Sequence, residues 1–383
     1  MSAPDPQGIH ITGIFPELLG VGGVQEAGRL SVLAANDIVR RRGWSASFTS
    51  LNDPSGEQRI AVSGCSVSFQ SFARSKAQFI RDSVGKARAA HNCRAHVVLA
   101  GHPNLAPIAV WMQKMSPRAR AIVMAHGIEV WQPLALVRRA TIRHARIVTA
   151  PSSDTIQKLA EVQRVESAKT RLLPWPLNPD FLHLAGATKF AAPSGFPQGK
   201  VILSIGRLAA SEQYKGTDNL IRAVAQLRAV HPDLHFVHIG SGDDLARLQN
   251  LAKELGVADC VHFLKGFSRE ELADCYAHAD IFAMPSAGEG FGLVYLEAMA
   301  FGKPLVAAAA GGALDLVQDG VNGLLVQARD LASLASALAR LLEDACLRQK
   351  LGQRGAALVR EKYRFESFVS NLEQIFDDCL MDS

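Results

Sequence analysis

The chain reads Gly288-Glu289-Gly290-Phe291-Gly292-Leu293-Val294-Tyr295-Leu296-Glu297 in its second half. Glycines let the backbone approach a ligand closely, and the residues from Leu293 to Phe301 predict a helix that ends at Gly302. The first amides of that helix would be free to bind an anion, because they have no backbone partner and the helix dipole favours negative charge there. One carboxylate, Glu289, falls in the loop and the other, Glu297, in the helix. A ligand that carries both phosphates and hydroxyl groups would engage all these parts, and a nucleotide sugar is such a ligand.

Length and composition are those of an ordinary globular protein with two domains. A chain of 383 residues is long for one hydrophobic core. Hydrophobic residues make up 48% of the chain and charged residues 20%, a composition that argues against disorder. No apolar run reaches the roughly 18 residues of a membrane-spanning helix. The segment from Met1 to Gly8 lacks the features of a secretory signal. The six cysteines show no CxxC pair, so we expect reduced thiols in a cytoplasmic protein.

The net charge of +5 is distributed unevenly along the chain. Residues 1–180 contain 22 Lys and Arg against 12 Asp and Glu, which gives +10, whereas residues 181–383 contain 19 against 24. The first half is therefore expected to favour an anionic membrane surface or an anionic acceptor. Nucleic acid is not expected as a partner, because no recognised binding motif accompanies the charge.

Short apolar strands alternate with helical stretches in both halves. In the first half we expect strands at Ile9–Phe15, Trp44–Ser50, His96–Ala100, Ala121–Ala125 and Ile147–Ala150. In the second half we expect them at Val201–Ile205, His235–Ile239, Val261–Leu264, Ile281–Met284 and Pro304–Ala308. This βαβ rhythm predicts two consecutive α/β domains, each a doubly wound parallel sheet.

The boundary between the two domains is expected in the proline-rich segment Leu173–Gly199, which is interpreted as a linker. We place a first domain at residues 1–175 and a second at residues 176–364. A last helix, Phe365–Leu380, within the final segment 365–383, is expected to cross back to the first domain.

Four groups of residues follow expected strand ends, which is where ligands bind in open α/β sheets. The first is Gly20-Val21-Gly22-Gly23, which either contacts a phosphate or sugar through its backbone or forms a tight βα turn. It lacks a complete GxGxxG, and no acidic residue ends the second strand to bind a ribose, which argues against a dinucleotide site. The second is His126-Gly127-Ile128-Glu129, whose histidine either points into a cleft as a hydrogen-bonding group or faces solvent.

The third group contains two cations. Arg207 follows Gly206 at the end of a strand, and Lys215 lies just before a helix. A guanidinium and an ammonium suit a diphosphate leaving group, the alternative being two solvated surface charges. Gly240-Ser241-Gly242 follows the next strand and is a weaker case. The fourth group is the opening stretch, where glycines around Glu289 favour a ligand site over solvent exposure. No DxD, HExxH, GxxxxGK[ST] or GxSxG motif is present.

The segment Phe69–Arg88 interleaves apolar with basic residues. It is interpreted either as an interfacial membrane helix or as a domain helix whose apolar face lies in the core.

Several strings around these groups resemble the signature of a known family. They are His278-Ala279-Asp280-Ile281-Phe282-Ala283-Met284-Pro285-Ser286, Glu289–Leu293, Glu297–Ala300, Gly302-Lys303-Pro304, Gly311-Gly312 and Asp319–Val326. They resemble the retaining GT-B glycosyltransferases of the "glycosyl transferases group 1" type. The resemblance is dense from about Val201 to Val326 and sparser in the first half. It is nearest to hexose or mannose transferases of bacterial surface polysaccharide, lipopolysaccharide and glycolipid assembly.

The resemblance implies two Rossmann-like domains that face a central cleft, with the donor mainly on the second domain and the acceptor on the first. It implies that Arg207 and Lys215 hold the diphosphate. It also implies that Glu289 contacts the transferred sugar, Glu297 binds the ribose, and His126 hydrogen-bonds the sugar. We take His126, Arg207, Lys215 and Glu289 as the catalytic set. The other candidate donor-binding residues are Gly22, Gly23, Gly206, Gly240, Gly242, Gly266, Phe267, Phe291, Gly292 and Leu293.

The implied reaction moves a mannose- or glucose-type hexose from a GDP- or UDP-linked donor to a saccharide or lipid-linked saccharide acceptor, with retention. No cofactor and no divalent metal are expected beside the nucleotide sugar. The alternatives are a nucleotide-sugar epimerase of the same fold, a non-catalytic sugar-binding protein, and a nucleotide-dependent oxidoreductase. The oxidoreductase would need a regular GxGxxG motif, which is not clear in this sequence. We expect a cytoplasmic protein, either free or held peripherally at the inner face of the membrane through its basic first domain.

Overall fold

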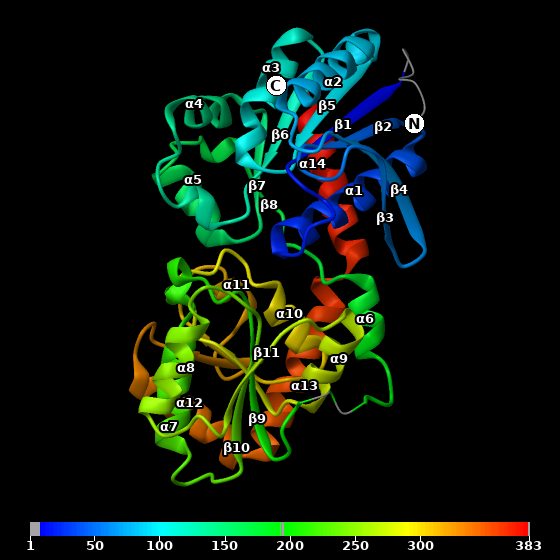
Figure 1. Cartoon of the computed structure of the whole chain (residues 1–383). Helices are drawn as coiled ribbons and strands as arrows, with labels where there is room; N and C mark the ends of the chain where they lie inside the picture. Colours follow the sequence, from blue (N-terminus) through cyan, green and yellow to red (C-terminus); the bar gives the residue numbers. More distant parts are fainter. Residues whose placement is uncertain (1–7, 192, 194, 382–383) are drawn as a thin grey trace. The chain divides into compact units, whose positions relative to one another are not determined.

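A computed structural model describes residues 8–191, 193 and 195–381 of the chain (Figure 1). The chain divides into two compact units. The first unit comprises Met1–Pro179 together with Arg364–Ser383, and the second comprises Asp180–Tyr363. Each unit has its own sheet and its own hydrophobic core.

The first unit contains an eight-stranded sheet in the order β3-β4-β2-β1-β5-β6-β7-β8. Its strands are β1 (Ile9–Phe15), β2 (Ser45–Ser50), β3 (Gly56–Val62), β4 (Cys65–Ser71), β5 (Ala95–Ala100), β6 (Ala119–Met124), β7 (Ile147–Ala150) and β8 (Thr170–Leu172). Successive residues of β1 serve opposite faces, as the period of a strand requires. Ile11 and Phe15 belong to one buried cluster and Ile14 to another. The central strands β5, β6 and β7 consist of nearly continuous apolar runs, as expected for parallel strands covered on both sides.

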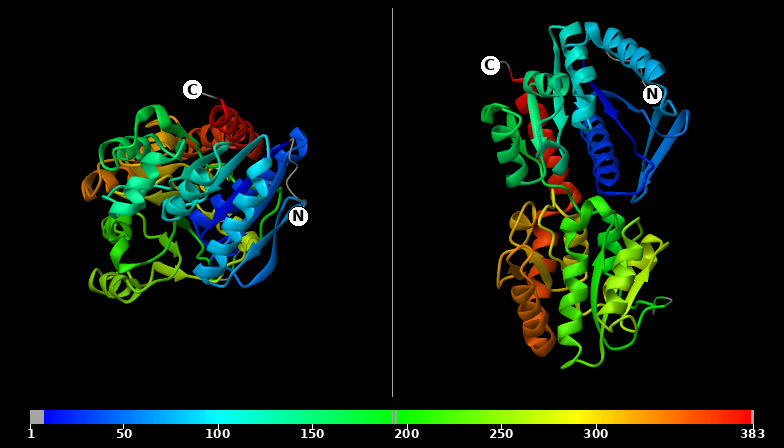
Figure 2. Two further views of the ribbon diagram at one scale, coloured as in Figure 1. Left: turned by 90° about the horizontal axis from the view of Figure 1, so that it is seen from above. Right: turned by 60° about the vertical axis from the view of Figure 1, so that its left-hand side comes forward.

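Helices cover both faces of this sheet. They are α1 (Gly23–Arg42), α2 (Lys76–Ala89), α3 (Ala106–Met115), α4 (Leu136–His144), α5 (Ser153–Glu161) and α14 (Phe365–Leu380). Although α14 is the last element of the chain, it packs against α1 (Figures 1 and 2, red). Its residues Phe368, Leu372 and Phe376 are buried in the same cluster as Ile11. Arg42 at the end of α1 forms ion pairs with Glu373 and Asp377 of α14.

The second unit contains a six-stranded sheet in the order β11-β10-β9-β12-β13-β14, with parallel pairing between neighbours. Its strands are β9 (Lys200–Ile205), β10 (Leu234–Ile239), β11 (Val261–Leu264), β12 (Ile281–Met284), β13 (Leu305–Ala308) and β14 (Gly323–Val326). Its helices are α6 (Pro179–Ala185), α7 (Thr217–Leu227), α8 (Leu245–Glu254), α9 (Arg269–His278), α10 (Leu293–Ala300), α11 (Ala313–Leu316), α12 (Leu331–Glu343) and α13 (Ala345–Lys362).

Each sheet has a point where the strand order reverses. In the first sheet β1 lies between β2 and β5, and in the second β9 lies between β10 and β12. In open α/β sheets, ligands bind beyond the carboxyl ends of the strands at such a point. The residues at these positions are Gly20–Gly23 after β1, Gly206 and Arg207 after β9, and Glu289 after β12.

The expected parallel sheet is present in both units, and the first sheet carries one addition at its edge, where β3 and β4 form an antiparallel hairpin. The interpretation of Phe69–Arg88 as a single helix is wrong. Phe69 is buried in β4, and α2 begins only at Lys76. Positive φ angles at Ala73 and Arg74 separate the strand from the helix, a backbone shape that no apolar–basic pattern signals.

The segment Leu173–Gly199 is not an open linker throughout. Leu173 and Trp175 are buried in the first unit, and the helix α6 follows. Prolines do not distinguish an open linker from a buried or helical segment, since they fix φ without preventing burial and are tolerated in the first turn of a helix.

Candidate functional site

The loop between β12 and α10 is fixed by its backbone. Gly292 has φ 95°, a conformation that favours glycine, and a Cβ there would collide with the ring of Tyr295. The amide of Gly312 donates to the carbonyl of Glu289 at 2.7 Å, and that of Ala287 donates to the carbonyl of Tyr214 at 2.8 Å. Gly292 supplies no side-chain cap to α10, so the helix starts with amides that a ligand could engage.

Glu289 lies in crowded surroundings within this loop. Burial raises the pKa of its carboxyl above the usual range, with Glu212 acting in the same direction and Lys215 in the opposite one. The amides of Gly290 and Phe291 donate to the carboxylate. A carboxyl held in this way can accept hydrogen bonds from sugar hydroxyls, but it is costly to keep ionised when the site is empty.

Glu297 projects from α10 and is bonded to a tyrosine of α9. The hydroxyl of Tyr276, a fully buried residue of α9, donates to Oε2 of Glu297 at 2.7 Å. This contact orients the carboxylate, whose two oxygens are of the kind that accept hydrogen bonds from a vicinal diol.

The two predicted cations lie together, as parts of the segment that leads from β9 to α7. A single carboxylate, that of Glu212, bridges them: Oε1 pairs with Arg207, and Oε2 lies 2.8 Å from Nζ of Lys215. Side-chain exposure is 76% for Arg207, 18% for Lys215 and 14% for Glu212, so the pair presents an accessible guanidinium and a more enclosed ammonium.

The glycines near these cations allow loops to pack closely. A Cβ on Gly240 would collide with the carbonyl of Gly206, and one on Gly242 would collide with that of Leu208. His238, buried on β10, donates from Nε2 to the carbonyl of Gly206 at 3.0 Å. The Gly-Ser-Gly pattern therefore has a packing role whether or not its amides also contact a ligand. Gly266 and Phe267 follow β11, at the edge of the sheet, and φ is 81° at Gly266.

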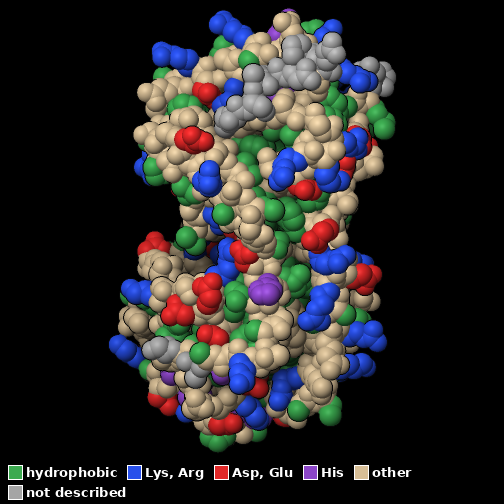
Figure 3. All heavy atoms as spheres, turned by 90° about the vertical axis from the view of Figure 1, so that its right-hand side faces the viewer, with side chains coloured by type: hydrophobic (Ala, Val, Ile, Leu, Met, Phe, Trp, Pro, Cys, Tyr) green, Lys and Arg blue, Asp and Glu red, His purple; other side chains and the backbone are tan. Residues whose placement is uncertain are grey.

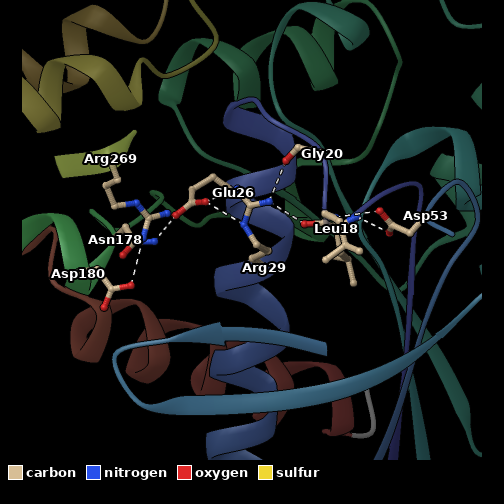
Figure 4. Close-up of polar contacts among 9 residues, drawn as sticks. Leu18, Gly20, Glu26, Arg29, Asp53, Asn178, Asp180 and Arg269 are labelled. Atoms are coloured by element: carbon tan, nitrogen blue, oxygen red, sulfur yellow. Dashed lines mark hydrogen bonds and ion pairs between the residues drawn. The ribbon is translucent and has the colours of Figure 1, made fainter. Parts of the chain in front are cut away.

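In the first unit, the glycine turn is held in place by side chains from elsewhere (Figure 4). Asp53, buried just after β2, accepts from the amides of Leu18 and Leu19 at 2.7 and 2.9 Å. Arg29 of α1 donates to the carbonyls of Leu18 and Gly20 at 2.7 and 2.8 Å. The next residues, Val21 to Gly23, are exposed. The predicted donor contacts Gly22 and Gly23 thus lie at the accessible end of an otherwise fixed turn.

His126 is buried at the end of β6 rather than solvent-facing. Its Nε2 donates to the carbonyl of Gly101 at 2.7 Å, and its ring contacts those of His102 and Trp175, with centroids 5.6 and 5.3 Å away. Nδ1 has no hydrogen-bond partner within the described part of the chain. Because Nε2 carries the proton, Nδ1 is left as an acceptor that a hydroxyl could satisfy.

The structure thus brings Arg207, Lys215 and Glu289 together and pairs Glu297 with Tyr276, all in the second unit, whereas His126, Gly22 and Gly23 belong to the first. Sequence reasoning missed Glu212 and Tyr276. A signal for Glu212 existed, since it lies between the two cations in the sequence. None existed for Tyr276, which meets Glu297 only through packing of α9 on α10.

Three comparisons with known proteins bear on this site. Residues 188–358 match the family described as "Glycosyl transferases group 1". A D-inositol 3-phosphate glycosyltransferase of Stackebrandtia nassauensis is 38% identical over 54% of this chain and 48% of its own length. A GDP-mannose-dependent alpha-(1-6)-phosphatidylinositol monomannoside mannosyltransferase of Mycolicibacterium smegmatis is 34% identical over 67% of this chain and 69% of its own.

Among solved structures, sucrose-phosphate synthase from Thermosynechococcus elongatus superposes with a TM-score of 0.70 at 23% identity, over 97% of this chain and 98% of the other. A likeness at this identity shows a shared fold alone. The match to the Stackebrandtia relative spans about half of that protein's length, whereas the match to the mycobacterial relative spans more than two thirds of it.

Proposed function

Because the chain belongs to the glycosyl transferases group 1 family and has the GT-B fold, we propose that it transfers a hexose from a nucleotide-diphosphate sugar to a hydroxyl acceptor with retention of configuration. One observation carries the proposal. The second unit gathers Arg207, Lys215 and Glu289 where β9 and β12 end, beside a helix that starts with uncapped amides.

These groups match the parts of a nucleotide sugar. Arg207 and Lys215 are suited to the diphosphate, and with the first amides of α10 they would stabilise the negative charge that develops as the sugar leaves. Glu289 is suited to the hydroxyls of the transferred sugar and Glu297 to those of the ribose. In the first unit, Nδ1 of His126 is suited to accept a hydrogen bond from a hydroxyl of a bound substrate.

The proposed reaction needs no side chain as a nucleophile. The acceptor hydroxyl attacks the anomeric carbon on the face that the diphosphate leaves, and a departing phosphate oxygen takes its proton. We also propose that no divalent metal is required, because two cationic side chains are available to balance the charge of the leaving group.

The substrates can be narrowed by what the relatives' names say. The mycobacterial relative uses GDP-mannose, which makes GDP-mannose the first donor to test and a UDP-linked hexose the second. Both relatives' names include inositol, bound to phosphate in one and part of a phospholipid in the other. We propose a saccharide or lipid-linked acceptor of this anionic kind, in agreement with the charge of +10 on residues 1–180.

A membrane-facing surface is proposed for α3 and α4, not for α2. Trp111 on α3 and Leu136 and Val137 at the start of α4 are exposed, and the two helices pack against each other. Residues 101–150 carry seven Lys and Arg but one acidic residue. On the face shown in Figure 3, by contrast, acidic and basic side chains are interspersed. No helix within the described ranges is long and apolar enough to cross a bilayer.

The proposal is tested by incubating the protein with GDP-mannose or UDP-glucose, with and without inositol phosphates, phosphatidylinositol or simple saccharides, and following the products by NMR. We expect released nucleoside diphosphate and a new glycosidic bond with the α-configuration of the donor. An epimerised donor without transfer would favour the epimerase alternative, and a β-linked product would contradict retention.

Two variants connect that activity to the site. Glu297→Gln keeps an acceptor for Tyr276 but loses the charge, and we expect donor affinity to fall about 10-fold or more. Tyr276→Phe removes only the orienting hydroxyl and should cost less. Full donor affinity and turnover in Glu297→Gln would remove Glu297 from the site.

A further inference from the structure

Glu212 neutralises the two cations on which the proposed donor site depends. Its two carboxylate oxygens take one cation each, Arg207 on one side and Lys215 on the other. A nucleoside diphosphate would present the same pattern of neighbouring anionic oxygens. The carboxylate and the diphosphate therefore compete for the same two partners.

The surroundings of Glu212 add repulsion to this competition. Its side chain is largely buried, and Glu289 is a second carboxyl close enough for the charge of Glu212 to act on it. The carboxylate of Glu212 thus already compensates part of the positive charge of the two cations in the empty site. An arriving diphosphate then meets like charge from Glu212 unless that side chain turns away.

The backbone around Glu212 is fixed by neighbouring loops. The amide of Leu208 donates to the carbonyl of Ser241 at 3.0 Å, and that of Ala210 donates to Asp243 at 2.8 Å. The carbonyl of Tyr214 is held by Ala287. These contacts favour an exchange of partners at the cations that rearranges side chains and leaves the backbone of the segment in place.

We propose that Glu212 is an internal substitute for the diphosphate: it holds Arg207 and Lys215 together while the site is empty, and the nucleotide displaces it. This inference rests on the proposed function and deepens it by assigning a positioning residue. The consequence is weaker binding of both donor and nucleoside diphosphate product. Weaker product binding favours release, a step that limits turnover in many enzymes.

The test compares the wild type with Glu212→Gln and Glu212→Ala in calorimetric titrations with GDP, UDP and inorganic pyrophosphate. We expect both variants to bind the nucleoside diphosphate and pyrophosphate about three- to tenfold more tightly, since one opposing charge is removed from a partly exposed site. Affinity for guanosine or uridine should not change. In turnover assays of these variants, KM for the donor should fall because the donor binds more tightly. The value of kcat should fall as well, because the nucleoside diphosphate product leaves more slowly. Glu254→Gln, which removes an exposed carboxylate at the end of α8, is the control and should match the wild type.

The outcomes separate the inference from the function. If the wild type binds GDP or UDP but both Glu212 variants, folded by circular dichroism, bind it equally or more weakly, Glu212 is not a competitor and the inference fails while the function stands. A change that is equally large for the phosphate-free nucleosides would also overturn it. If the wild type binds no nucleoside diphosphate at all, the proposed function itself fails.

Discussion

At the scale of residues, the second unit holds the Glu289 carboxyl where its negative charge lowers the stability of the folded protein. Burial raises the pKa of the Glu289 carboxyl, so its ionised form is less stable in the folded protein than in the unfolded chain. Such groups are typical of ligand sites, where stability is given up for binding. Arg207, Lys215 and Glu289 could be singled out as candidates from the sequence because each has a glycine beside it, Arg207 and Glu289 after a strand and Lys215 before a helix. Tyr276 could not be assigned, because its partner Glu297 is set by side-chain packing, whereas the place of Glu212 between the two cations was a signal that sequence reasoning did not use.

Two histidines of the first unit are buried away from any site residue and give a prediction for pH. His10 on β1 contacts Ser45 and Ser47 at 2.8 and 3.1 Å, and His96 on β5 contacts Thr12 at 2.9 Å. Burial lowers the pKa of His10 to about 4, with Lys86 contributing, and that of His96 to about 3. Because both folded pKa values lie below the ordinary value of 6.5, their stability contribution is complete above that value and is lost as the pH falls towards about 4.

We therefore expect the free energy of unfolding of the first unit to fall by about 2 kcal/mol or more between about pH 7 and about pH 5. Tryptophan fluorescence in urea measures this, because Trp44, Trp111, Trp131 and Trp175 all belong to the first unit. His96→Gln should reduce the pH dependence, whereas the exposed His91→Gln should not. An equal pH dependence in wild type and His96→Gln would show that His96 is not a buried neutral group.

At the scale of elements, the sequence predicted most strands of both units within a few residues, since they are short apolar runs between helical stretches, but it missed the edge strands β8 and β14. It failed at the hairpin β3–β4, whose alternating polar residues suit an edge of the sheet, and at the break before α2. The break bears on the interpretation of Phe69–Arg88 as an interfacial membrane helix. Phe79 of α2 packs in the core, and Ile80 is the exposed large apolar side chain of this helix, so α2 offers little apolar surface to a membrane.

The start of α4 is expected to dock on anionic bilayers in its place. The wild type should sediment with phosphatidylglycerol vesicles, less so as salt increases, and weakly with phosphatidylcholine. Leu136→Ser combined with Val137→Ser should reduce binding about fivefold or more, because two exposed apolar side chains are lost. The control is Ile80→Ser on α2. A loss of binding in Ile80→Ser, with the double variant unaffected, would assign docking to α2.

At the scale of the whole molecule, the chain builds two units of the same α/β kind, the first completed by its own last helix. The period of the strands made the two sheets predictable. The contribution of α14 to the first core depends on Phe368, Leu372 and Phe376 meeting α1 more than 300 residues away in the sequence, which local patterns cannot encode. The roles of the candidate residues likewise depend on which strand ends lie side by side.

Hydrogen–deuterium exchange with and without GDP or UDP tests the central claim most directly, because it needs no acceptor and locates the nucleotide on the chain. The account predicts slower exchange in the segments 206–216, 240–244 and 287–297 of the second unit, and none of this protection in the double variant Arg207→Ala, Lys215→Ala. Protection confined to other segments, or no protection at nucleotide concentrations that saturate the protein, would contradict it.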